Sequence, residues 1–101
     1  DIAVFRGDGS GQFSPASTIV SAAVTLVAAD FTGDGRVDLA SADGNKIVRH
    51  DNLGGLTFAG SVSVPLAATE LEAIDVDGDA FADLIATSAT GVHRRLRRRG
   101  L

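Results

Sequence analysis

Short stretches of alternating apolar and polar residues run along the chain, separated by clusters of Gly, Asp and Asn. Residues 61–64 read Ser-Val-Ser-Val, the alternation of a strand with one buried face. Other short runs are rich in Val, Ile, Leu and Thr and end at turn-forming residues. No segment sustains a helical periodicity. The pattern predicts an all-β fold, with strands over residues 1–5, 13–20, 24–29, 39–42, 47–50 and 57–64.

The pattern repeats with a period of 45 residues. Asp75 lies 45 positions after Asp30, and the same offset carries Phe13 onto Phe58. Four short strands in a unit of roughly 40–50 residues are typical of a β-propeller blade. The predicted fold is therefore a β-propeller fragment of about two four-stranded antiparallel blades. Its divisions are 1–20 (the last two strands of one blade), 21–65 (a complete blade), 66–95 (the start of the next blade) and 96–101 (a basic tail).

Two Asp-rich stretches, 30–38 and 75–83, occupy equivalent places between the first and second strands of a blade. Ca²⁺ takes six to eight oxygen ligands at about 2.3–2.6 Å, which a short, tightly turned, Asp-rich loop can supply. Solvated Asp-Gly turns are the alternative interpretation. The calcium hypothesis uses side-chain oxygens and the backbone carbonyls of two residues, Arg36 and Phe81. The full ligand set is Asp30, Thr32, Asp34, Arg36, Asp38, Asp75, Asp77, Asp79, Phe81 and Asp83.

Two of the differences between the stretches bear on the calcium hypothesis. Thr32 stands where the second stretch has Asp77, which removes one negative charge from the first. Ala80 stands where the first stretch has Gly35, at a position expected to favour a positive φ. The second loop is therefore predicted to be richer in charge but strained, and the first to be better shaped but poorer in charge.

Composition and charge narrow the classes of function. The chain has 101 residues, enough for at most one ordinary domain, and no Cys, so disulfides are excluded. No apolar run approaches the roughly 20 residues that cross a membrane, and no signal peptide is visible. Because the first residue is not Met and lies in a predicted strand, a mature product or a fragment is expected. All 13 Asp and Glu precede His93, and an acidic body argues against nucleic acid as a partner.

The remaining motifs carry little chemistry. No H-E-x-x-H or G-x-S-x-G pattern is present, so we expect a protein that is not an enzyme. His50 and His93 have no motif partner, and surface or strand-edge roles are expected for both. Arg6-Gly7-Asp8 reads as part of a hairpin turn. The five Arg of residues 94–99 either contact an anionic surface or form an aberrant terminus, and the sequence leaves both open.

The two Asp-rich stretches and the segment Gly7-Asp8-Gly9-Ser10-Gly11-Gln12-Phe13 resemble the FG-GAP or VCBS-type repeat family. Repeats of that family form blades of calcium-binding β-propellers, as in integrin α-chain heads, some fungal lectins and many secreted bacterial proteins. The resemblance runs to about residue 92. It implies Ca²⁺ at the Asp-rich stretches, a secreted or cell-surface location, and work in binding or adhesion.

These observations lead to one principal functional expectation and one alternative. The principal expectation is a non-catalytic, calcium-binding propeller module that binds a glycan or protein ligand at an extracellular surface. The alternative is an accessory propeller segment of a secreted enzyme whose catalytic residues lie outside this chain. A propeller closes with about four to eight blades, so neighbouring blades are the expected partners. They would come from the same longer chain or from a homo-oligomer.

Overall fold

The computed structural model describes residues 1–76, 78, 80–88 and 93–96. These residues form nine β-strands and no helix, which confirms the all-β prediction. Among them there is accordingly no helix with the length and apolar character needed to cross a membrane. The strands are β1 (Ile2–Gly7), β2 (Phe13–Ile19), β3 (Thr25–Ala29), β4 (Asp38–Ala42), β5 (Ile47–Gly54), β6 (Thr57–Val64), β7 (Ala68–Ile74), β8 (Asp83–Ser88) and β9 (His93–Leu96).

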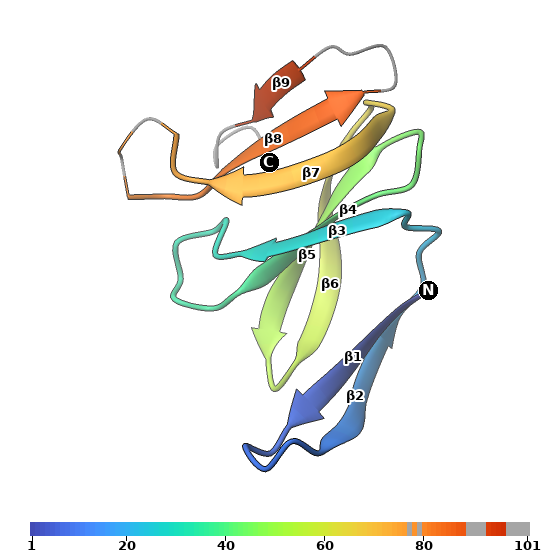
Figure 1. Cartoon of the computed structure of the whole chain (residues 1–101), viewed down its shortest axis with the longest axis vertical. Coiled ribbons are helices and arrows are strands. Elements are labelled where there is room, and N and C mark those ends of the chain that lie inside the picture. The colour runs from blue at the N-terminus through green and yellow to red at the C-terminus, as the bar shows by residue number, and fades with distance from the viewer. Residues whose placement is uncertain (77, 79, 89–92, 97–101) are drawn as a thin grey trace.

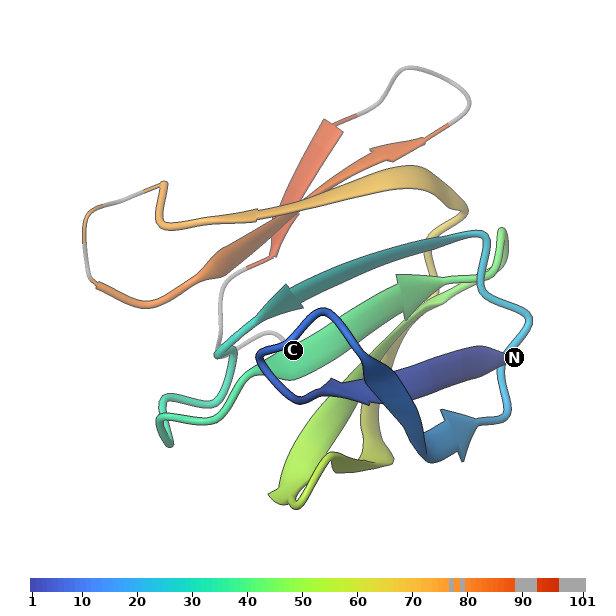
Figure 2. The same ribbon diagram turned by 60° about the horizontal axis from the view of Figure 1, so that its bottom comes forward.

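The strands form three antiparallel sheets that follow one another along the chain (Figure 1). The first sheet is the hairpin β1–β2, the second is β3–β4–β5–β6, and the third is β7–β8–β9. Each strand pairs with its neighbour in sequence, as in the meander of a propeller blade. Figure 1 shows the hairpin β1–β2 and the sheet β7–β9 on opposite sides of the sheet β3–β6; in Figure 2 the hairpin passes in front of the sheet β3–β6. The architecture is that of a propeller-like fragment.

The repeat seen in the sequence is also a repeat of strand pairing. Leu26 pairs with Ser41 between β3 and β4, and Leu71 pairs with Ala86 between β7 and β8. Each residue of the second pair lies 45 positions after its counterpart in the first. The first two strands of successive blades therefore pair in the same register.

Strand β5 extends further than the sequence pattern indicated. The predicted strand ended at residue 50, but β5 continues to Gly54 and pairs with β6 as far as Thr57. The reversal is confined to Gly55 and Leu56, whose φ angles are 64° and 63°. Positive φ at both central residues is what a two-residue type I′ hairpin turn requires. The glycines of this segment thus close a tighter turn than expected.

The hydrophobic core lies between the second and third sheets. Small side chains of β4 pack with Leu84 and Ala86 of β8, and all of these are fully buried. Phe31, which belongs to the first Asp-rich stretch rather than to a strand, is also fully buried there. The core consists of Phe31, Ala40, Ala42, Ile47, Ala68, Leu84 and Ala86. It fixes the first Asp-rich stretch against the neighbouring blade.

Candidate functional site

The first Asp-rich stretch connects β3 to β4 and brings three carboxylates together. One oxygen from each of Asp30, Asp34 and Asp38 lies within 4.8 Å of the other two. Asp38 is fully buried, Asp30 is partly buried and Asp34 is exposed. The cluster is therefore open to solvent on one side and anchored in the blade on the other. Its geometry suits a cation held at the mouth of the loop.

Asp30 shapes the loop through backbone hydrogen bonds. Its Oδ1 accepts a hydrogen bond from Gly33 N and its Oδ2 one from Gly35 N, both at 2.8 Å. Both glycines have positive φ, 77° and 84°, which turns their N–H groups inward. Burial acts to raise the pKa of Asp30, but the hydrogen bonds from Gly35 and Gly33 outweigh it and the pKa lies below its ordinary value. The carboxylate thus stays ionised, as cation binding requires.

Asp38 connects the loop to two other parts of the blade. Its Oδ2 accepts hydrogen bonds from Phe31 N at 3.1 Å and Thr32 N at 3.3 Å. Its Oδ1 accepts one from Asn52 N at 2.9 Å, on the neighbouring strand β5. Asn52 also donates from Nδ2 to the carbonyl oxygen of Val37 at 2.9 Å. The buried carboxylate therefore fixes the loop both to its own start and to β5.

The other predicted ligands of the first loop lie around this cluster. The Thr32 hydroxyl lies 3.1 Å from Asp38 Oδ2 and 3.4 Å from Asp30 Oδ1, between two carboxylates. Arg36 is exposed, and its backbone N–H donates to Asp34 Oδ1 at 2.9 Å. Thr32 thus belongs to the same hydrogen-bonded cluster as Asp30 and Asp38.

The second Asp-rich stretch, between β7 and β8, repeats the bonding of the first at the 45-residue offset. Asp75 accepts hydrogen bonds from Gly78 N at 2.8 Å and Ala80 N at 2.9 Å, and Asp83 Oδ2 accepts one from Val76 N at 3.0 Å. Asp83 is buried, like Asp38. Phe81 is about one-third exposed, with a relative exposure of 36%. Two further predicted ligands, Asp77 and Asp79, lie outside the described residues.

The backbone confirms the predicted positive φ at the glycine position of each loop. Ala80 has a φ of 70°, and Gly35, its counterpart in the first loop, has a φ of 84°. An L-residue with a side chain is strained in this region, whereas glycine is not. The second loop therefore carries the backbone strain that its sequence predicted.

Two residues that shape the site were missed by the sequence analysis. Phe31 buries its ring in the core, while its counterpart Val76 is 49% exposed. Asn52 bonds to the loop from β5, but the 45-residue offset places Gly7 and Arg97 at its equivalent positions. The repeat could not have identified Asn52, because its role depends on a contact with Asp38, which is distant in sequence and close only in the folded chain. The apolar residue directly after Asp30 and Asp75 was the available signal for Phe31.

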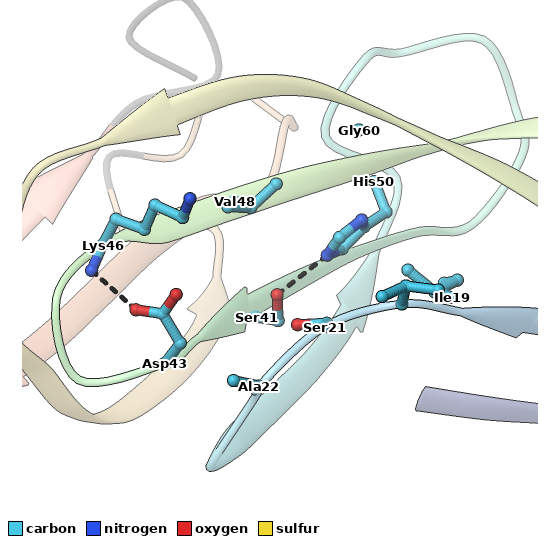
Figure 3. Close-up of a pocket in the computed structure, with 10 residues that line it drawn as sticks. Ile19, Ser21, Ala22, Ser41, Asp43, Lys46, Val48, His50 and Gly60 are labelled. Atoms are coloured by element: carbon cyan, nitrogen blue, oxygen red, sulfur yellow. Dashed lines mark hydrogen bonds between the residues drawn. The ribbon is translucent and has the colours of Figure 1, made fainter. Parts of the chain in front are cut away.

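A cleft lies on the other face of the sheet β3–β6, beside the connection from β2 to β3 (Figure 3). It has a volume of about 330 Å³ and is lined by residues that include Ser41, Lys46 and His50. Ser41 Oγ and His50 Nε2 are 2.8 Å apart, as the dashed line in Figure 3 shows. The expectation of a surface or strand-edge role for His50 is wrong: it is 5% exposed in the middle of β5. It lies between its pairing partners Leu39 on β4 and Gly60 on β6.

Ser41 and His50 are residue types that can form a nucleophile and its general base, but their surroundings do not suit catalysis. Ser41 is 2% exposed, so a substrate has little access to its hydroxyl. A catalytic base is oriented by a third group, whereas His50 Nδ1 has no hydrogen-bond partner among the described residues. Burial is the main cause that lowers the pKa of His50, so the imidazole is neutral near pH 7. The pair forms a buried polar contact within the sheet.

Comparison with known proteins gives one match. A family model described as FG-GAP-like repeat matches residues 30–86, which is more than half of the chain. The match begins at the first residue of the first Asp-rich stretch and includes the whole of the second. No curated protein and no solved structure matches the chain.

Proposed function

The chain belongs to the FG-GAP-like repeat family, and on that premise we propose that it is a calcium-binding module of a β-propeller. The observation that carries the proposal is the convergence of Asp30, Asp34 and Asp38 within 4.8 Å. Three carboxylate groups at this separation repel one another, and a divalent cation removes the repulsion. Calcium would therefore stabilise the folded loop.

The chemistry of the donors fits calcium rather than a transition metal. Every candidate side-chain ligand in the first loop is an oxygen, from Asp30, Thr32, Asp34 and Asp38, and the Arg36 carbonyl would add another. Oxygen donors suit hard cations, whereas His and Cys ligands suit zinc and copper. In the second loop Asp75 and Asp83 would bind the ion together with Asp77, Asp79 and Phe81. The role proposed for the ion is structural.

The functional consequence that we propose is non-catalytic binding. A propeller blade whose Asp-rich loops are fixed by calcium presents rigid loops at one end of the fold, and such loops are common ligand-binding elements. We propose a secreted or cell-surface setting, which supplies the calcium that weak extracellular sites need. The proposed ligand is a glycan or a protein. The test is to display the chain on a cell surface and measure its binding. A displayed chain that binds neither a glycan array nor any extracellular protein would contradict this part of the proposal.

Thermal and urea unfolding with calcium and with excess chelator test the metal site. Calcium at 100 times its dissociation constant should add about 2.7 kcal/mol to the free energy of unfolding. Asp34→Asn removes the charge of an exposed carboxylate. In the described structure this carboxylate accepts a local hydrogen bond from Arg36 N. A tenfold loss of affinity in this variant would lower the calcium-dependent stabilisation by about 1.4 kcal/mol.

Asp43→Asn is the matched control for this experiment. Asp43 is likewise an aspartate in a turn, and its Oδ1 accepts hydrogen bonds from Asn45 N and Lys46 N at 2.9 Å, but it lies outside the cluster. This variant should keep the full response to calcium. Equal losses in the two variants, or no effect of calcium on the parent chain, would show that the loops are ordinary solvated turns.

A further inference from the structure

The hairpin β1–β2 leaves part of the β3–β6 sheet uncovered. Besides the cleft next to His50, a second hollow of about 370 Å³ lies between residues 1–3 and 23–26. Val24 and Leu26 are 70% and 43% exposed there. By contrast, the opposite face of the sheet is covered by β7 and β8 and holds the buried core. The sheet β3–β6 is the central blade of the three sheets. One of its faces therefore lacks apolar cover over its first strands.

The 45-residue offset identifies which strands would supply that cover. Ile2 at the start of β1 corresponds to Ile47 at the start of β5, so β1 and β2 are the third and fourth strands of a blade. Strands β7 and β8 correspond to β3 and β4, the first and second strands. The hairpin β1–β2 and the pair β7–β8 are thus complementary halves of one blade.

Strand β9 pairs with β8 in a register that departs from the repeat. In the central blade Leu39 pairs with His50, so the offset predicts that Leu84 pairs with Arg95. The observed partner of Leu84 is Leu96, one residue further along. A slip by one residue exchanges the two faces of a strand. The repeat register would have set Arg95 opposite the fully buried Leu84.

Strand β1 has the sequence that the repeat register requires at this edge. Moved by the offset, the pairing of β4 with β5 sets Phe5 opposite Leu84 and Val4 opposite Ile85. Phe5 would then lie opposite the buried Leu84, in the place that Leu96 of β9 occupies. Phe5 and Phe13 are at present 54% and 73% exposed and line one apolar hollow.

We propose that copies of this chain associate head to tail, with β1 of one copy pairing with β8 of the next in place of β9. The proposal rests on the blade assignment in the proposed function, and not on calcium. The shared blade then consists of β7 and β8 from one copy and β1 and β2 from the other. This association would cover Phe5 and Phe13 of one copy. It would also cover the exposed face of that copy's β3–β6 sheet.

The two surfaces that would meet are both polar. Glu70 and Glu72 are exposed on β7, and their partners Thr87 and Ile85 on β8 line a hollow with them. In the proposed assembly this face meets the cleft lined by both Lys46 and Asp43. Head-to-tail contacts of this kind close into a ring when the rotation between successive copies permits it.

Disulfide trapping in the full chain tests the register. The chain has no Cys, so Val4→Cys combined with Ile85→Cys introduces the only two thiols. Cross-strand partners have Cα atoms about 4.5–5.5 Å apart, within the range of a disulfide. Within one copy β1 and β8 lie on opposite sides of the central sheet, so a bond between these positions must join two copies (Figure 1). Mild oxidation should produce covalent oligomers.

Ala3→Cys combined with Ile85→Cys is the matched control, displaced by one residue onto the other face of β1. It should form at least roughly tenfold fewer cross-links. Equal yields from the two variants, or a parent chain that sediments as a monomer at high concentration with and without calcium, would overturn the proposal. A monomer that calcium stabilises would contradict only the head-to-tail assembly. An oligomer that ignores calcium would contradict only the proposed metal site.

Discussion

A neutral, buried histidine lies at the centre of the central blade and makes its stability depend on pH. His50 accepts or donates one hydrogen bond with Ser41 and is otherwise surrounded by strand residues, with Val48 and Gly60 close by. Burial lowers its pKa below the ordinary 6.5 and outweighs the opposing effect of Asp51. The unfolded chain therefore binds a proton at a higher pH than the folded chain does.

We predict that the free energy of unfolding falls as the pH is lowered through 6.5 towards the depressed folded pKa, and is unaffected by His50 above that range. His50→Gln keeps a polar partner for Ser41 but cannot titrate. Urea unfolding at about pH 7.5, 6.5 and 5.5 should show a smaller fall for the variant than for the parent chain. His93 is present in both proteins and cancels in the comparison. If the free energy of unfolding falls equally with pH in both proteins, His50 is not the source of the pH dependence.

The two Asp-rich loops allow a direct test of backbone strain, because the first has Gly35 and the second has Ala80 at the equivalent positive-φ position. Ala80→Gly should stabilise the chain by about 0.5–1 kcal/mol, since the strain of a positive φ exceeds the entropy that glycine adds to the unfolded chain. Gly35→Ala should destabilise it by about 1–2 kcal/mol through the backbone alone, because its added Cβ would meet nothing within 4 Å. In each variant the substituted residue should keep its backbone N–H hydrogen bond to the first Asp of the loop, to Asp30 from residue 35 and to Asp75 from residue 80. Urea titrations in chelator measure both, and shifts of the same sign would contradict the strain argument.

The elements most open to prediction were those fixed by local chemistry and by the repeat. Alternation located β6 to the residue, and the Asp-Gly spacing located both loops together with the strained Ala80. Contacts between distant strands had no such signal: Asn52 reaches Asp38 across a hairpin, and His50 is buried by strands on both sides. The one-residue slip of β9, which sets Leu96 opposite Leu84, also had no signal in the repeat.

At the scale of the whole molecule, the three sheets are held to one another very unequally. The second and third sheets share the buried core, in which Ile47 and Leu84 are fully buried. The hairpin β1–β2 is joined to β6 and its turn by side-chain hydrogen bonds, from Ser17 Oγ to the Leu56 carbonyl at 2.6 Å and from Arg6 Nη2 to the Gly55 carbonyl at 3.4 Å. The hairpin should therefore open without unfolding the rest.

Amide hydrogen exchange can measure this difference and relate it to assembly. At about 1 µM, where head-to-tail contacts dissociate, amides of β1 should exchange at least roughly tenfold faster than those of β4, which is hydrogen-bonded on both edges. At about 500 µM pairing with β8 of a second copy would protect the outer edge of β1, so its exchange should slow while that of β4 stays constant. A β1 strand that exchanges at one rate across this range, in samples whose sedimentation shows oligomers, would mean that copies associate through another surface. Slow exchange of β1 already at 1 µM would mean that the hairpin is held by its own chain, and the weak attachment inferred from Ser17 and Arg6 would be wrong.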